Sequence, residues 1–267
     1  MRVPDRPRTR RVWVDAAVVL GVVALYTWSA RGVGASVWEI LRGLPAMVDF
    51  VSRTVPPDMT ILPRLDKAII ETVQLAVVGT TVGVFVALPL SVLGARNFIG
   101  ATPVYYATRA LFNALRGISE FVYALLFVAM VGLGPFPGAL ALAVHTTGAL
   151  GKYFSEAIEN MDWQPMEAIA ATGASRTQLV FHGVLPQLTP QFLAYGFYYF
   201  EHNIRASTVL GLVGAGGLGI ELMTSLKLFK YREVAAVVIV MLVLITAADQ
   251  LSAWARRRAF AGSVART

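Results

Sequence analysis

The stretch EAIAATG, Glu167–Gly173, together with its continuation to Leu185 and Pro186, decides how this chain is organised. It is a polar interruption between apolar segments that are long enough to cross a bilayer. Pro165 and Glu167 predict the start of a short helix, because proline suits the first helical turn and a carboxylate there is stabilised by the helix dipole. Gly173 predicts the end of this helix, since glycine lets the backbone turn sharply at no steric cost.

A second short helix is predicted directly after this bend. The segment from Ser175 to His182 is amphipathic, and Pro186 predicts the start of the next membrane helix. Two short helices across the mouth of a helical bundle would form a docking surface for a soluble partner. The alternative interpretation is a polar hairpin that only connects two membrane helices.

Composition indicates a membrane protein. Of the 267 residues, 56% are hydrophobic and 15% are charged, and the mean hydropathy is +0.62. A soluble domain of average composition has about 25% charged residues. Because the sequence has no cysteine, it excludes a disulfide framework and a thiolate metal site, and we expect no metal ligands in this chain.

The net charge of +7 does not indicate nucleic-acid binding, because the basic residues gather at the chain ends and in loops. This distribution is typical of cytoplasmic segments that flank membrane helices. We therefore expect both termini in the cytoplasm, with a basic arm over Met1–Arg11. The apolar stretch Val12–Ala30 has the layout of a signal peptide, but no cleavage site of small residues follows it, which favours a retained span.

An all-α membrane domain of about six transmembrane helices is predicted, since an even number of spans brings both termini to one side. Ser36–Arg53 is amphipathic and is expected to lie at the outer membrane surface. We divide the chain into an N-terminal region 1–65, a transmembrane domain 66–255 that contains the loop 160–186, and a basic tail 256–267. The predicted spans are Val12–Ala30, Asp66–Arg96, Tyr105–Val131, Ala139–Ile158, Gln187–Leu210 and Glu233–Trp254.

Small residues predict where these spans pack and turn. Gly79 and Gly83 lie four apart in the second span, a spacing that lets a neighbouring helix approach closely. The glycine- and proline-rich segment Gly132–Gly138 predicts a tight turn on the outer side.

Charged residues inside the predicted spans are expected to have a structural or functional role, because a charge at the bilayer centre costs roughly 2.5–3.5 kcal/mol on insertion scales. Arg116 and Glu120 are four apart in the third span, as are Glu201 and Arg205 in the fifth, so each pair would neutralise itself on one helical face. Alternatively, these groups line a water-filled route for a polar solute. Residues expected along such a translocation path are Asn113, Arg116, Glu120, His145, Glu201, Asn203 and Arg205.

The sequence GAGGLG, Gly214–Gly219, matches the dinucleotide-binding pattern G-x-G-x-x-G, but no βαβ unit surrounds it. It is better interpreted as a compact outer turn in which glycines allow close backbone contact. An outer gate, a contact for a soluble receptor and a tight corner all remain open as its role. The glycines concerned are Gly214, Gly216, Gly217 and Gly219.

The loop 160–186 resembles the EAA loop of the membrane subunits of ATP-binding-cassette importers. That pattern reads E-A-A, three residues, G, nine residues, I-x-L-P. Ile169 here replaces the second alanine, and Gly183 stands where isoleucine is usual. The resemblance implies coupling to a separate ATPase through the five matching positions, which are Glu167, Ala168, Gly173, Leu185 and Pro186. We refer to residues 160–186 as the coupling loop.

From about Glu71 to Ala255 the order of motifs resembles the phosphonate-type permeases of this superfamily, although methionine permeases share the loop and a similar glycine turn. The motifs that carry the resemblance are LRGISE (115–120), GLGPF (132–136), HTTG (145–148), EHNIR (201–205) and LGLVGAGG (210–217). It implies a type I importer fold and a homodimer in the bacterial plasma membrane. Two cytoplasmic ATP-binding subunits would bind ATP and Mg²⁺ for it, and an extracytoplasmic binding protein would deliver phosphonate, so no cofactor is expected in this chain.

The implied mechanism is alternating access, in which closure of the ATP-binding subunits moves the coupling loop. In this mechanism Glu167 is fixed by capping and by contacts in a groove of the ATPase, and Gly173 supplies the bend. A proton-coupled secondary transporter that uses Glu120, Glu201 and His145 is an alternative, although the sequence shows no clear internal repeat. An intramembrane enzyme is disfavoured, since no HExxH, no GxSxG and no pair of membrane aspartates occurs.

Overall fold

A computed structural model describes residues 8–34 and 36–264. Within these residues every regular element is a helix and no strand is present, which confirms the all-α prediction. The chain divides into two compact units, Met1–Arg53 and Thr54–Thr267. Most of the predicted basic arm and the end of the basic tail lie outside the described residues. The predicted domain boundaries at 65 and 255 stay predictions.

The first unit contains two helices, α1 (Arg8–Gly32) and α2 (Val37–Thr54). The described apolar side chains of α1 are largely exposed, for example Leu20 at 69%, as suits a helix that is surrounded by lipid. Helix α2 also carries charged residues, and Arg53 pairs with Asp49 at 2.9 Å on its exposed surface. These features agree with a span followed by a surface helix, and the placement of both in the membrane stays a prediction.

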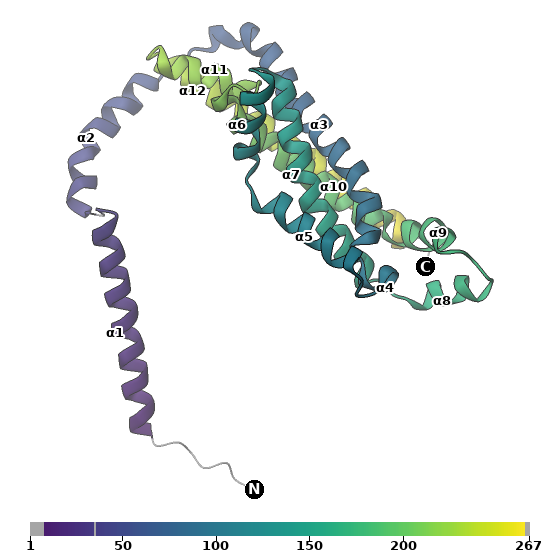
Figure 1. The fold of residues 1–267 in the computed structure, drawn as a ribbon. Helices are drawn as coiled ribbons and strands as arrows, with labels where there is room; N and C mark the ends of the chain where they lie inside the picture. The colour runs from purple at the N-terminus through teal and green to yellow at the C-terminus, as the bar shows by residue number, and fades with distance from the viewer. Residues whose placement is uncertain (1–7, 35, 265–267) are drawn as a thin grey trace. The chain divides into compact units, whose positions relative to one another are not determined.

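The second unit is a helical bundle in which the long helices α3, α7, α10 and α12 run side by side (Figure 1). Short helices connect them at both ends of the bundle. The elements are η1 (Met59–Ile61), α3 (Leu62–Leu93), α4 (Arg96–Ile99), α5 (Pro103–Gly117), α6 (Glu120–Val131), α7 (Pro135–Glu159), α8 (Gln164–Ala171), α9 (Arg176–Leu179), the π-helix η2 (Val180–Val184), α10 (Leu185–Leu210), η3 (Gly211–Val213), α11 (Leu218–Lys227) and α12 (Tyr231–Val264).

Helix α7 is the core of this bundle, and glycines on α3 bring the two helices together. A Cβ on Gly79 would lie 2.5 Å from Leu142 Cβ, and one on Gly83 would lie 2.6 Å from Thr146 Cγ2. Both distances are shorter than a Cβ contact allows, so only glycine permits this approach. The prediction that Gly79 and Gly83 admit a close neighbour is confirmed, and the neighbour is α7.

Among the described residues, length and hydropathy identify two helices that can cross a membrane by themselves, Met59–Leu93 and Tyr231–Arg258. Two bent pairs add up to two broken spans, Pro103–Gly117 with Glu120–Val131 and Arg176–Val213 with Leu218–Lys227. Helix α7, which contains the predicted span Ala139–Ile158, is not among these candidates, and most of its residues are buried against protein.

The predicted span Tyr105–Val131 is not one continuous helix but a broken pair. The chain bends by 84° between α5 and α6, where Ile118 is extended and Ser119 precedes the first residue of α6. Asn113, Arg116 and Glu120 therefore do not share one helical face. The predicted Arg116–Glu120 pair is replaced by other partners of Glu120, described below.

Candidate coupling and translocation sites

The first short helix of the coupling loop forms where the sequence predicts it. Helix α8 begins beside Pro165 and presents Glu167 and Ala168 to the outside, while Met166 is buried. Trp163, just before α8, packs edge-on against Phe98 of α4 with ring centroids 5.4 Å apart. Among the described residues the Glu167 carboxylate has no hydrogen-bond or ion-pair partner, so the expectation that capping fixes it is wrong. The carboxylate is free to meet another protein.

The bend after α8 requires glycine for its backbone conformation alone. Gly173 has φ +82°, and a Cβ at this position would meet nothing within 4 Å. Helix α9 then begins with a reciprocal cap, in which the Ser175 hydroxyl accepts from the Gln178 backbone N–H and the Gln178 side chain accepts from the Ser175 N–H. The two predicted short helices and the glycine bend between them are thus present.

Pro186 lies in the first turn of α10 (Leu185–Leu210), as predicted, but this helix does not start from a free end. Helix α9 continues through the π-helix Val180–Val184 into α10 without a break. In an α-helix the ring of Pro186 would clash with the carbonyl of His182. The π-helix closes with a wider bond from the Leu185 N–H to the Val180 carbonyl, which puts the irregular turn directly before the proline.

The two departures from the EAA pattern occur at residues that contact each other. A Cβ on Gly183 would lie 2.3 Å from Met166 Sδ and 3.3 Å from Ile169 Cδ1. The side chains of Met166 and Ile169 therefore occupy the space that a larger residue at 183 would need. The isoleucine gained at 169 makes up for the one missing at 183, and α8 packs directly on the π-helix.

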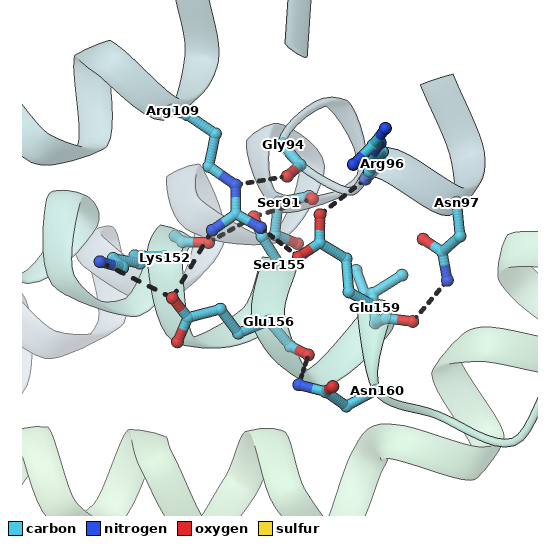
Figure 2. Close-up of polar contacts among 12 residues, drawn as sticks. Ser91, Gly94, Arg96, Asn97, Arg109, Lys152, Ser155, Glu156, Glu159 and Asn160 are labelled. Atoms are coloured by element: carbon cyan, nitrogen blue, oxygen red, sulfur yellow. Dashed lines mark hydrogen bonds and ion pairs between the residues drawn. The ribbon is translucent and has the colours of Figure 1, made fainter. Parts of the chain in front are cut away.

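The base of the coupling loop is held by a network of charged and polar groups around Arg109, which we call the anchor network (Figure 2). Arg109 of α5 is only 17% exposed and donates to Glu159 near the end of α7 and, at 2.8 Å, to the Gly94 carbonyl. Glu156 lies 3.6 Å from the same guanidinium. Glu159 also accepts from the backbone N–H of Arg96 at 2.8 Å. The last turn of α7 is therefore fixed to α4 and α5 just before the chain enters the loop.

Of the residues predicted to line a path, Asn203 lies in the core instead. Its side chain is fully buried and donates to Thr80 Oγ1 at 2.9 Å and to Thr146 Oγ1 at 3.0 Å. One amide thus connects α3, α7 and α10. In this conformation Asn203 faces protein and not an open route.

The other path residues are more accessible. Arg205 and Glu201 form the predicted pair on α10 at 2.7 Å, with the Arg205 side chain 57% exposed. Asn113 and Arg116 are exposed on α5. A cavity of about 260 Å³ lies beside α10 and is lined by Glu120 and Arg205. Whether this surface conducts a solute stays a prediction.

Glu120 meets two histidines that arrive from different helices. Its carboxylate oxygens lie 3.6 Å from His145 Nε2 of α7 and 3.7 Å from His202 Nε2 of α10. The two imidazole rings are nearly parallel, at 21° with centroids 6.2 Å apart. The sequence analysis did not include His202 among the path residues, because nothing in the spacing shows that α6, α7 and α10 converge here.

The segment Gly211–Gly219, which we call the glycine corner, is mostly buried. A Cβ on Gly216 would lie 2.9 Å from Pro135 Cα, and Gly217 has φ +73° with its backbone N–H donating to Glu71 at 3.1 Å. The Leu218 N–H donates to Thr72 Oγ1 at 2.9 Å. This packing agrees with a tight corner, and the roles as an outer gate or as a receptor contact stay predictions.

A profile of the family described as "Binding-protein-dependent transport system inner membrane component" matches residues 79–260. The chain belongs to this family. It is a multi-pass permease subunit of the inner membrane, as the coupling loop and the order of motifs implied.

Two relatives with a named transport substrate are similar to this chain over most of its length. The phosphite transport system permease protein PtxC of Stutzerimonas stutzeri is 42% identical over 91% of this chain and 88% of its own length. The phosphate-import permease protein PhnE of Mycolicibacterium smegmatis is 36% identical over 92% of this chain and 44% of its own length.

Solved structures show the same fold. An inward-facing conformation of the MetNI methionine ABC transporter superimposes with a TM-score of 0.67 and 20% identity, over 76% of this chain and 99% of that chain. A bacterial ABC transporter for alginate gives 0.54 and 16% identity, over 91% and 98%. These similarities confirm the type I importer fold.

Proposed function

We propose that this permease imports a phosphorus oxyanion, phosphite or a phosphonate, by ATP-driven alternating access. The relative PtxC is named for phosphite transport, and the motif order resembles phosphonate-type permeases. The exposed Arg116 and Arg205 would lower the electrostatic barrier to a solute with a net negative charge, a gain that is smaller for a zwitterion such as methionine. Charge reversal at both positions is expected to slow uptake.

The observation that carries the coupling role is the unpaired carboxylate of Glu167 on an exposed, well-anchored helix. A free charged group in the first turn of α8 suits a groove on a cytoplasmic ATP-binding subunit, which would hold ATP and Mg²⁺ and carry out hydrolysis. This chain would then need no cofactor for energy conversion. The coupling loop and both termini would lie in the cytoplasm, with the glycine corner on the opposite side.

The transport unit would contain a second permease subunit, two ATP-binding subunits and an extracytoplasmic binding protein. A homodimer is the arrangement that the resemblance to phosphonate-type permeases implies, and PtxC aligns with this chain over 88% of its own length. This chain spans 44% of PhnE, so a pair with a different permease subunit is the other arrangement. Chain-specific affinity tags on two co-expressed copies would distinguish them.

The test is uptake of phosphite and of a small alkylphosphonate into vesicles that contain the permease, the ATPase and the binding protein. Valine in the left-handed region costs about 1–2 kcal/mol, which lowers the population of the bent loop roughly 5–30-fold. Gly173→Val should therefore reduce uptake while ATP hydrolysis and membrane insertion persist. Gly173→Asn is the matched control, because asparagine adopts positive φ more readily.

Normal uptake by Gly173→Val would contradict the coupling assignment. Uptake that needs no ATP, or that stops when an ionophore collapses the proton gradient, would favour the proton-coupled alternative. Uptake of methionine but of neither phosphorus compound would overturn the substrate class alone.

A further inference from the structure

We propose that Glu120, His145 and His202 bind a divalent transition-metal ion of the zinc type. One ligand atom from each residue can be chosen so that all three lie within 4.8 Å of one another. The three residues come from α6, α7 and α10, so a bound ion would join three helices of the bundle. The proposal of a metal site does not depend on whether these residues line a translocation path.

The geometry is close to that of a metal centre. Zinc binds histidine nitrogen and carboxylate oxygen at about 2.0–2.2 Å in a tetrahedron, which sets neighbouring ligand atoms roughly 3.3 Å apart. The observed separations are 3.6 Å from Glu120 Oε2 to His145 Nε2 and 3.7 Å from Glu120 Oε1 to His202 Nε2, and one ligand atom from each residue lies within 4.8 Å of the other two. The side chains are 15–34% exposed, and small rotations within this space would complete the coordination.

The hydrogen bonding of His145 presents a lone pair to the site. Its Nδ1 lies 3.1 Å from the carbonyl of Ile118, which is a hydrogen-bond acceptor, so Nδ1 carries a proton and donates. In the neutral ring Nε2 then holds a lone pair that faces the Glu120 carboxylate. Two electron-rich atoms this close repel each other unless a proton or a metal cation lies between them, and an outer N–H···O=C bond of this kind is common for metal-binding histidines.

His202 supplies a second, independent observation. Its Nε2 atom is buried and has no hydrogen-bond partner among the described residues. An unpaired buried nitrogen is costly unless a group outside the protein satisfies it. That nitrogen lies 3.7 Å from the Glu120 carboxylate, on a ring stacked nearly parallel to that of His145, where it would be the third ligand.

The charge balance and the access route agree with a cation. Within the described part of the chain, the ion-pair partners of Glu120 are the two histidines, while the nearby Arg205 is already paired with Glu201. The cavity of about 260 Å³ lined by Glu120 and His202 leaves room for a fourth ligand such as water. Two imidazoles and one carboxylate suit zinc, cobalt, nickel or copper better than magnesium or calcium.

The experiment uses the full-length permease purified with its ATPase partner and without a polyhistidine tag. Zinc and cobalt are titrated in separate arms, with bound metal measured by elemental analysis and cobalt coordination followed by visible absorption. We expect one ion per permease chain and a tetrahedral cobalt spectrum. Loss of an outer hydrogen-bonding partner alone costs roughly 10–100-fold in metal affinity, so Glu120→Gln, His145→Gln and His202→Gln should each weaken binding by about 100-fold or more.

His182→Gln is the matched control, because His182 is the third histidine of the chain and lies in the coupling loop. Elution as a monodisperse complex shows that each variant is folded. Zinc should also raise the thermal unfolding midpoint of the wild type and of His182→Gln, but not that of His202→Gln. The proposal is overturned if the wild type binds no zinc or cobalt at micromolar concentrations, or if folded His202→Gln retains the ion.

Discussion

Helix α7 is held at its two ends by different kinds of interaction. At its N-terminal end, Pro135 and Gly138 pack against the glycine corner, where a Cβ on Gly138 would lie 2.6 Å from the Ala215 carbonyl oxygen. At its C-terminal end, Glu156 and Glu159 belong to the anchor network around Arg109. One end is fixed by shape and the other by charge.

This difference indicates which end of α7 can move. Close packing loses its energy over a fraction of an ångström, whereas an ion pair weakens gradually with distance and exchanges partners. The glycine corner therefore suits a fixed point. The anchor network lies next to the coupling loop, where an ATP-driven movement would enter the bundle.

The largest expected effect is at the glycine corner. Gly217→Ala should lower the free energy of unfolding by about 2–6 kcal/mol, from roughly 1–3 kcal/mol of overpacking and roughly 1–3 kcal/mol of backbone strain. Its Cβ would lie 2.7 Å from Thr72 Oγ1, at φ +73°. Unfolding in mixed detergent, followed by circular dichroism, measures the change.

Gly100→Ala is the control for this variant. Gly100 has the same φ of +73°, but a Cβ there meets nothing within 4 Å. The difference between the two variants isolates the packing contribution. Equal destabilisation would mean that the glycine corner is not held by shape.

The next effect is at the anchor network. Arg109→Ala removes the guanidinium donor of Glu159, which keeps its bond from the Arg96 N–H, and the donor of the Gly94 carbonyl, and we expect a loss of about 1.5–3 kcal/mol, as for hydrogen bonds to charged groups. Arg109→Lys should recover part of this loss, because one ammonium cannot reproduce the planar fork. Arg53→Ala breaks an exposed pair with Asp49 and should cost no more than about 1 kcal/mol. If Arg109→Ala lost as little stability as Arg53→Ala, the anchor network would not hold the C-terminal end of α7.

The middle of α7 gives a smaller effect. Asn203→Leu removes the bonds to Thr80 and Thr146, and side-chain bonds between membrane helices are worth about 0.6–2 kcal/mol. A double-mutant cycle with Thr146→Val measures this coupling directly. Full additivity of the two substitutions would show that the amide does not join the helices.

The smallest effect is that of salt. Raising the ionic strength from about 0.05 M to about 0.5 M screens partly exposed charges, and should reduce the Arg109→Ala penalty by a few tenths of a kcal/mol. The Gly217→Ala penalty should not change. If salt changed the Gly217→Ala penalty instead, charge rather than close packing would hold the N-terminal end of α7.

The sequence predicts the local features of the coupling loop well. Helix α8, the bend at Gly173 and the second short helix all depend on residues within a few positions of each other. The same holds for Gly79 and Gly83, whose spacing alone shows that a helix packs closely there. Each of these features is determined by residues that are close together in the sequence.

Features that depend on tertiary structure were predicted less well. The apolar run over Tyr105–Val131 reads as one span, and only the extended Ile118 with Ser119 before α6 marks the 84° break. The burial of Asn203 and the meeting of Glu120 with His202 depend on which faces of α6, α7 and α10 converge. No spacing along the chain contains that information.

The unbroken helix from Arg176 to Leu210 has a mechanical consequence. At 1.5 Å per residue, about 39 Å of rigid helix separates Arg176 in the coupling loop from His202. A tilt of about 5° at one end would displace the other by about 3 Å over that length. The carboxylate of Glu120 lies 3.7 Å from His202. A small rotation of this helix, started by a movement of the coupling loop, would therefore separate His202 from Glu120 and His145.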